Sequence, residues 1–265
     1  MKAQLHACLA IFHRDLQVFL SYRAAAFSLF FSGLFSIALF YYISRLVGVR
    51  GFETKQDYFA FVVVGLVILA VLQSTLVLSA ALRGELVAGT FERVVLSPFG
   101  PVRAVLSMMI FPVVQALVLG AWTIAVAAIF FGLDLRWETL PLALPAALLA
   151  ALSFSALALA VTAALIVFKQ APGLGALLAG ITLVSGLYFP AQLLPGWIRW
   201  TAEAQPFTPA VDLLRNLLVG LPAAHSDWVY AGRLVAFAVV LLPLATWGLA
   251  RAIEIGQRRG TIIEY

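Results

Sequence analysis

Residues 58–82 read YFAFVVVGLVILAVLQSTLVLSAAL, a run of 25 residues between Asp57 and Arg83 without a charged side chain. The hydrocarbon core of a bilayer is about 30 Å thick, and a helix needs roughly 20 residues to cross it. A charge at its centre costs about 2.5 to 3.5 kcal/mol on insertion scales. The run therefore predicts a helix that spans a membrane.

Five further charge-free runs follow Arg23, Arg103, Glu138, Lys169 and Arg233. Each is too long for an outer-membrane strand of about 10 residues, and none alternates apolar with polar side chains. The last run is the shortest, but Trp228, Val229 and Tyr230 extend it while Arg233 snorkels to the interface. The runs predict an all-α membrane protein, a single domain over 1–265, with six spans at about 24–44, 59–82, 105–131, 140–167, 171–190 and 229–250.

The composition excludes a soluble enzyme and a disordered chain. Of 265 residues 63% are hydrophobic and only 11% charged, against about 25% charged in globular proteins, and the mean hydropathy is +1.04. Cys8 is the single cysteine and the three histidines are scattered, so neither a disulfide nor a metal site is expected. The net charge of +5 is more typical of basic cytoplasmic loops than of a nucleic-acid partner.

The loop charges give the expected orientation. Six spans place both termini on the same side, and that side carries ten of the 17 Lys and Arg residues. Because positive residues favour the cytoplasmic face, we expect both termini in the cytoplasm and a multi-pass location in a bacterial-type inner (plasma) membrane.

Residues 1–23 predict an amphipathic helix in the membrane interface. Their apolar residues recur at helical spacing opposite polar ones (Leu5, Leu9, Phe12, Leu16, Phe19). The alternative is a packing helix that faces water. Because His13, Arg14 and Asp15 interrupt the apolar stretch, we expect no cleaved signal peptide here.

The chain has no energy source of its own. None of its lysines, Lys2, Lys55 and Lys169, stands in the G-x-x-x-x-G-K-[ST] pattern of a phosphate-binding loop. The spans contain no Asp, Glu, His or Lys to couple an ion, and H-E-x-x-H is missing. We therefore expect no enzyme activity and no catalytic, cofactor or metal-binding residues, but a pathway or scaffold powered by another chain.

Such a chain needs a docking surface, and the loop 83–103 offers one. Val87, Phe91, Val94 and Val95 share a face of a short helix that Pro98 would end. An aromatic residue flanked by charges is how a helix fills a groove on a partner protein. A helix that only lies on the membrane surface is the alternative.

Three motifs in this chain resemble one known family. The first is Gly89-Thr90-Phe91-Glu92-Arg93 followed by Ser97-Pro98; the second runs from Phe189-Pro190 through Pro195-Gly196-Trp197 and Gln205-Pro206 to Asp212 and Arg215; the third is the tail 258–265, RRGTIIEY. With the six-span layout, they resemble the permease subunits of type-2 ATP-binding cassette (ABC-2) exporters, over nearly the whole chain.

The resemblance implies partners. The loop after the second span would be a coupling helix that sits in a cleft of a cytoplasmic ATPase, which binds ATP and Mg²⁺, and two such ATPases would serve a permease dimer, most simply a homodimer. Its contact and shaping residues would be Glu85, Gly89, Thr90, Phe91, Glu92, Arg93 and Pro98.

The outer region 190–227 is rich in proline and aromatic residues. It predicts two short helices that fold back into the outer leaflet, and in the family such a re-entrant pair roofs the pathway. Pro190 and Trp197 belong to this region. Asp212 and Arg215 lie three apart on one helix face, where pairing would lower the burial cost of each; a solvated surface pair worth under about 1 kcal/mol is preferred over a substrate contact.

Small and polar residues in the spans suggest a pathway or dimer seam. Ser28, Ser32 and Ser36 recur every four residues, which is also typical of close helix packing. Tyr41, Tyr42, Gln73 and Tyr188 complete the candidate set. Uncharged walls favour a hydrophobic or amphipathic cargo: a drug-like molecule, a lipid or a lipid-linked glycan. Export of a polysaccharide of the O-antigen type, and a scaffold that transports nothing, are the alternatives.

Overall fold

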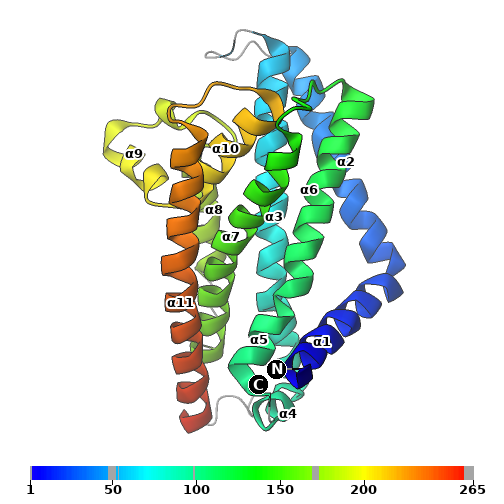
Figure 1. Cartoon of the computed structure of the whole chain (residues 1–265), viewed down its shortest axis with the longest axis vertical. Helices are drawn as coiled ribbons and strands as arrows, with labels where there is room; N and C mark the ends of the chain where they lie inside the picture. The colour runs from blue at the N-terminus through cyan, green and yellow to red at the C-terminus, as the bar shows by residue number, and fades with distance from the viewer. Residues whose placement is uncertain (1, 47–51, 53, 98, 169–172, 260–265) are drawn as a thin grey trace.

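The computed structural model describes residues 2–46, 52, 54–97, 99–168 and 173–259, and within these ranges every regular element is a helix (Figure 1). The long helices are α2 (Arg23–Leu46), α3 (Lys55–Val87), α6 (Ile110–Phe131), α7 (Leu140–Phe168) and α11 (Asp227–Arg259). The others are α1 (Lys2–Ser21), α4 (Phe91–Val95), α5 (Pro101–Met108), α8 (Leu174–Val184), η1 (Ala191–Leu193), α9 (Gly196–Glu203) and α10 (Phe207–Val219). The predicted all-α class is confirmed.

Five stretches of the described chain are long and apolar enough to cross a membrane. They are α2, α3, α5 together with α6, α7 and α11, which coincide with five of the six predicted spans. Met109 separates α5 from α6. Proline at 112 explains this break, because its ring lacks an N–H and clashes with the carbonyl four residues earlier.

The predicted fifth span, 171–190, forms no spanning helix in the described residues. Helix α8 has 11 residues, which is about 16 Å of helix and roughly half of the hydrocarbon core. It ends at Val184, and Gly186 then takes a left-handed backbone conformation with φ of +82°. Apolar composition alone did not reveal this turn, and residues 169–172 lie outside the described residues.

Local signals explain where two long helices begin and end. Thr54 accepts a hydrogen bond from the backbone of Asp57, whose carboxylate accepts one from the backbone of Thr54, so a capping box starts α3. Gly132, with φ of +67°, ends α6.

Both ends of the described chain lie at the same end of the bundle. In Figure 1, α1, α4, α5 and the C-terminal part of α11 gather at the bottom, whereas α9 and α10 lie near the top. We call these the inner end and the outer end. Helix α1 packs on the bundle through Phe12 and Phe19, whose rings are 6.1 and 5.7 Å from that of Phe111. Leu5 and Leu9 stay exposed, so the predicted apolar face is only partly covered.

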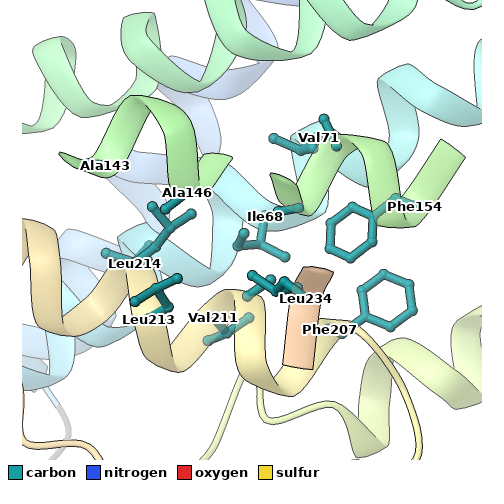
Figure 2. Packing of buried hydrophobic residues seen from close by; sticks show 14 of the residues in the cluster. Ile68, Val71, Ala143, Ala146, Phe154, Phe207, Val211, Leu213, Leu214 and Leu234 are labelled. Atoms are coloured by element: carbon teal, nitrogen blue, oxygen red, sulfur yellow. The ribbon is translucent and has the colours of Figure 1, made fainter. Parts of the chain in front are cut away.

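The main core lies where α10 packs against α3, α7 and α11 (Figure 2). Phe154 of α7 and Phe207 of α10 stack with ring centroids 4.5 Å apart. Ile68, Val211 and Leu214 fill the space between α3 and α10. Helix α10 therefore belongs to the packed bundle, although it is too short to span a membrane.

Candidate functional site: coupling loop, membrane groove and outer clamp

At the inner end, a glycine turn separates α3 from α4. Gly89 has φ of +67°, a conformation that a glycine adopts without steric cost. The turn is closed by Thr90, whose backbone N–H donates to the carbonyl of Glu85 at 3.0 Å and whose hydroxyl donates to the Glu85 carboxylate. We call the segment from Glu85 to Phe91 the inner joint.

Phe91 anchors α4 in the chain's own core. Its side chain is 0% exposed and packs in the inner hydrophobic cluster with Leu82, Leu86 and Val105. The expectation that Phe91 enters a groove on a partner does not fit this position, because the ring is already enclosed. Val87, expected on the same face, is exposed on the last turn of α3.

The exposed residues of the predicted coupling set are Gly89, Thr90, Glu92 and Arg93. Burial of Phe91 on one side of a five-residue helix leaves the charged side chains of Glu92 and Arg93 on the surface of the inner end. Pro98 lies outside the described residues, as does most of the tail motif 258–265. The inner end thus presents a small polar surface on α4, and the buried ring of Phe91 anchors this helix.

Helix α1 is tied to the inner joint by an ion pair. Arg14 Nη1 donates to Glu85 Oε1 at 3.0 Å, and Arg14 also pairs with Asp15 at 2.9 Å. Arg14 is about half exposed. No local sequence pattern indicates this contact, because the two residues are 71 positions apart.

A groove opens between α2, α3 and α6, with a cavity volume of about 380 Å³. Of the predicted pathway residues, Ser32, Ser36 and Gln73 line it, together with Gln115, whose side-chain oxygen is buried and has no hydrogen-bond partner in the described chain. The lining includes no charged residue. Ser32 and Ser36 donate their hydroxyl protons to carbonyls of α2, which leaves oxygen lone pairs free.

The other predicted pathway residues are not gathered at this groove. Ser28 donates to the carbonyl of Ala25 and does not line the cavity. Tyr41 packs on the rings of Phe59 and Phe131, while Tyr42 is exposed. Tyr188 packs against the main core beside α10. The structure therefore brings together three of the seven.

Near the outer end, Arg215 is buried at 4% exposure. Its guanidinium donates to the carbonyls of Phe61 (3.1 and 3.2 Å), Gly186 (2.9 Å) and Leu187 (3.0 Å). It also lies over the Phe61 ring, 3.3 Å from the centroid. We call this arrangement the outer clamp.

Asp212 and Arg215 are not a solvated surface pair; their position fits the other prediction, a pair that lowers the cost of burial. Their charged atoms are 3.8 Å apart, and both the arginine and most of the aspartate are enclosed. The physical reason is the break after α8: carbonyls without helical partners need donors, and Arg215 supplies them. The other predicted residues of this region sit apart, since Pro190 precedes η1 and Trp197 is exposed on α9.

Gly65 makes a close backbone contact beside the outer clamp that the sequence did not predict. A methyl group at this position would meet the carbonyl oxygen of Leu187 at 2.3 Å, so α3 and the end of α8 touch through backbone atoms. A glycine in the middle of the most apolar run was the available signal, because glycine there permits close approach.

Two comparisons with known proteins fit this architecture. The sequence model of a family described as "ABC-2 type transporter" matches residues 6–219. Nodulation protein J of Rhizobium meliloti (strain 1021) is 31% identical over 121 residues. That alignment covers 44% of this chain and 44% of the relative, so it spans less than half the length of the curated protein.

Proposed function

Because the chain belongs to the ABC-2 type transporter family, we propose that it is the transmembrane permease subunit of an ATP-driven exporter. It pairs with a second permease, in the simplest case another copy of itself, and with two separate ATPase subunits that bind ATP and Mg²⁺. The lack of a phosphate-binding loop supports a separate ATPase. The chain sits in a bacterial-type inner membrane with the inner end, and so both termini, in the cytoplasm.

The observation that carries the proposal is the inner end of α3 and α4. Phe91 anchors α4 in the core, so that Glu92 and Arg93 face outward on an attached helix. A charged pair on a short anchored helix suits a cleft on a partner protein, where charge complementarity sets register and partner choice. Closure of the ATPases would then bias the permeases between inward and outward states through this contact.

For the cargo, the groove between α2, α3 and α6 supports an uncharged or amphipathic molecule. Its wall is apolar apart from hydroxyl and amide groups. An ionic cargo would need partners that this wall lacks. A drug-like molecule, a lipid or a lipid-linked glycan meets this description, and Tyr42 with its exposed ring keeps export of a polysaccharide as the second candidate.

The test reverses the charges of α4 in the reconstituted complex. Glu92→Lys with Arg93→Glu should lower cargo-stimulated ATP hydrolysis about tenfold or more, because each charge then meets a like charge on the ATPase. The melting temperature should not change, since both side chains are exposed. Arg23→Glu, a single charge reversal on α2 away from α4, is the control for a charge change elsewhere on the chain.

The alternative is a scaffold that transports nothing, and it predicts that charge reversal on α4 leaves ATP hydrolysis unchanged. Unchanged hydrolysis in the charge-reversed complex, with Phe91 left in place, would contradict the coupling surface. Substitution of Phe91 itself is a poor test, because loss of a buried ring would damage the fold and the coupling together.

A further inference from the structure

A second groove runs along the other side of the bundle, between α7, α8 and α11. Its cavity volume is about 540 Å³, and its wall is built from small and apolar residues: Ala156, Ala160 and Ala163 of α7, and Ala245 and Gly248 of α11 among them. Protein interiors pack to crystal-like density. A cavity of this size with an apolar wall would therefore accommodate an apolar chain from the surrounding lipid.

A buried donor stands near one end of this groove. The side-chain nitrogen of Gln205, in the turn between α9 and α10, is buried and has no hydrogen-bond partner in the described chain. A buried amide without a partner is costly. The ester carbonyl of a phospholipid can accept a hydrogen bond from this nitrogen. It lies between the polar head group and the apolar chain of the lipid.

Charged residues border the same end. Glu203 and Arg233 line an adjoining cavity of about 430 Å³, which shares Leu241 with the groove. Neither side chain has an ion-pair or hydrogen-bond partner within the described ranges. A cation and an anion that line the same cavity complement a zwitterionic head group, with phosphate on Arg233 and an ammonium group on Glu203.

The dimensions agree with one phospholipid in the outer leaflet side of the bundle. From Arg233 to Gly248, α11 advances 15 residues, about 22 Å of helix. Half of a bilayer with its head groups is also about 20 to 22 Å thick. The head would thus lie at Arg233 while a chain reaches Gly248.

We propose that this groove, here called the α7–α11 groove, binds a zwitterionic phospholipid of the phosphatidylethanolamine type. The phosphate pairs with Arg233, the amine with Glu203, an ester carbonyl accepts from Gln205, and one acyl chain lies along Ala160. This proposal needs only the membrane-spanning fold and does not depend on the cargo or the coupling surface.

The first test measures bound lipid. The full chain, purified in mild detergent and supplied with phosphatidylethanolamine, should retain one phospholipid in native mass spectrometry, and diacylglycerol, which lacks the head group, should not compete. Ala160→Phe, which fills the groove from an exposed position, should abolish retention. Val239→Phe, exposed on α11 outside both cavities, should not.

The second test reads the head-group contacts. Arg233→Gln should lose the lipid, while Arg233→Lys should keep it. Equal retention by Ala160→Phe and Val239→Phe, or by Arg233→Gln and the unmodified chain, would overturn the proposal. So would a disulfide between two chains through a cysteine placed at Ala160 in a Cys8→Ser background, because a second copy would then occupy the groove.

Substitution of Gln205 should affect thermal stability differently without and with lipid. In lipid-free detergent, Gln205→Leu should raise the melting temperature, because an unpaired buried donor is removed. With phosphatidylethanolamine present, the same variant should gain less thermal stabilisation from the lipid than the unmodified chain. A lower melting temperature in both conditions would show that the amide serves the fold, and would refute its role toward lipid.

Discussion

The inner joint and the outer clamp each include a glycine with a positive φ angle, Gly89 and Gly186, yet they are held by different bonds. At the inner joint, an arginine that is about half exposed reaches a partly exposed glutamate from another helix. At the outer clamp, a buried arginine donates four hydrogen bonds to three backbone carbonyls. Charge pairs exposed to water contribute little to stability, whereas buried charges are costly to leave unpaired.

This difference assigns different mechanical roles to the two ends. The bonds of Arg215 tie α10 to α3 and to the turn after α8, so we expect these elements to move as one body. The inner joint can change its ion pair at small energetic cost while Phe91 keeps α4 attached. In an exporter driven from the cytoplasmic side, the contact with the ATPase would then lie where the permease yields most easily.

The largest expected effect is the loss of the outer clamp. Arg215→Met removes the donor to the non-helical carbonyls of Gly186 and Leu187 and leaves Asp212 without its cation, which should lower the free energy of unfolding by about 3 to 5 kcal/mol. Thermal unfolding in mixed micelles measures this. Arg199→Met is the matched control: Arg199 also donates to backbone carbonyls, but is exposed, and should cost under about 0.5 kcal/mol.

Equal effects at Arg215 and Arg199 would contradict the rigid outer end. Both ends of the permease would then depend on exposed contacts that can be replaced at small energetic cost.

The next effect comes from two glycines in α3. Gly65→Ala places a methyl group against the carbonyl oxygen of Leu187 and should cost about 1 to 3 kcal/mol. Gly84→Ala meets open space near the inner end and should stabilise α3 by up to about 1 kcal/mol, because alanine favours a helix. Melting temperatures of the two variants should shift in opposite directions. A stabilising Gly65→Ala would mean that the end of α8 is not held against α3.

The contrast also shows what the sequence could reveal. Five of the apolar runs form helices long enough to span a membrane, because lipid leaves a charge-free run of 20 residues few other structures. The same criterion failed at 171–190. The run there is equally apolar, but Gly186 turns the chain. The carbonyl of Gly186 then has no helical donor, and Arg215, 29 positions further along the chain, donates a hydrogen bond to it.

The candidate site was predictable in its position and not in its contacts. The spacing of Val87, Phe91, Val94 and Val95 predicted a short helix in the loop 83–103, and α4 is part of it; the turn at Gly89, which leaves Val87 on α3, was not predicted. Periodicity gave Phe91 an apolar face, but could not tell whether this face meets the chain's own core or a partner. Contacts such as Arg14 with Glu85 depend on which helices become neighbours, and that information is absent from local patterns.

The ion pair between Arg14 and Glu85 at the inner joint should contribute least to stability. A double-mutant cycle with Arg14→Gln and Glu85→Gln should give a coupling free energy of about 0.2 to 1 kcal/mol, because Arg14 is solvated in the folded state. The value should fall with added salt, since exposed charges are screened. Unfolding of the four variants in the same micelles at low and high salt supplies the measurement. A salt-independent coupling above about 3 kcal/mol would be the magnitude of a buried pair. The inner joint would then be as rigid as the outer clamp, and the yielding element of the permease would have to lie elsewhere.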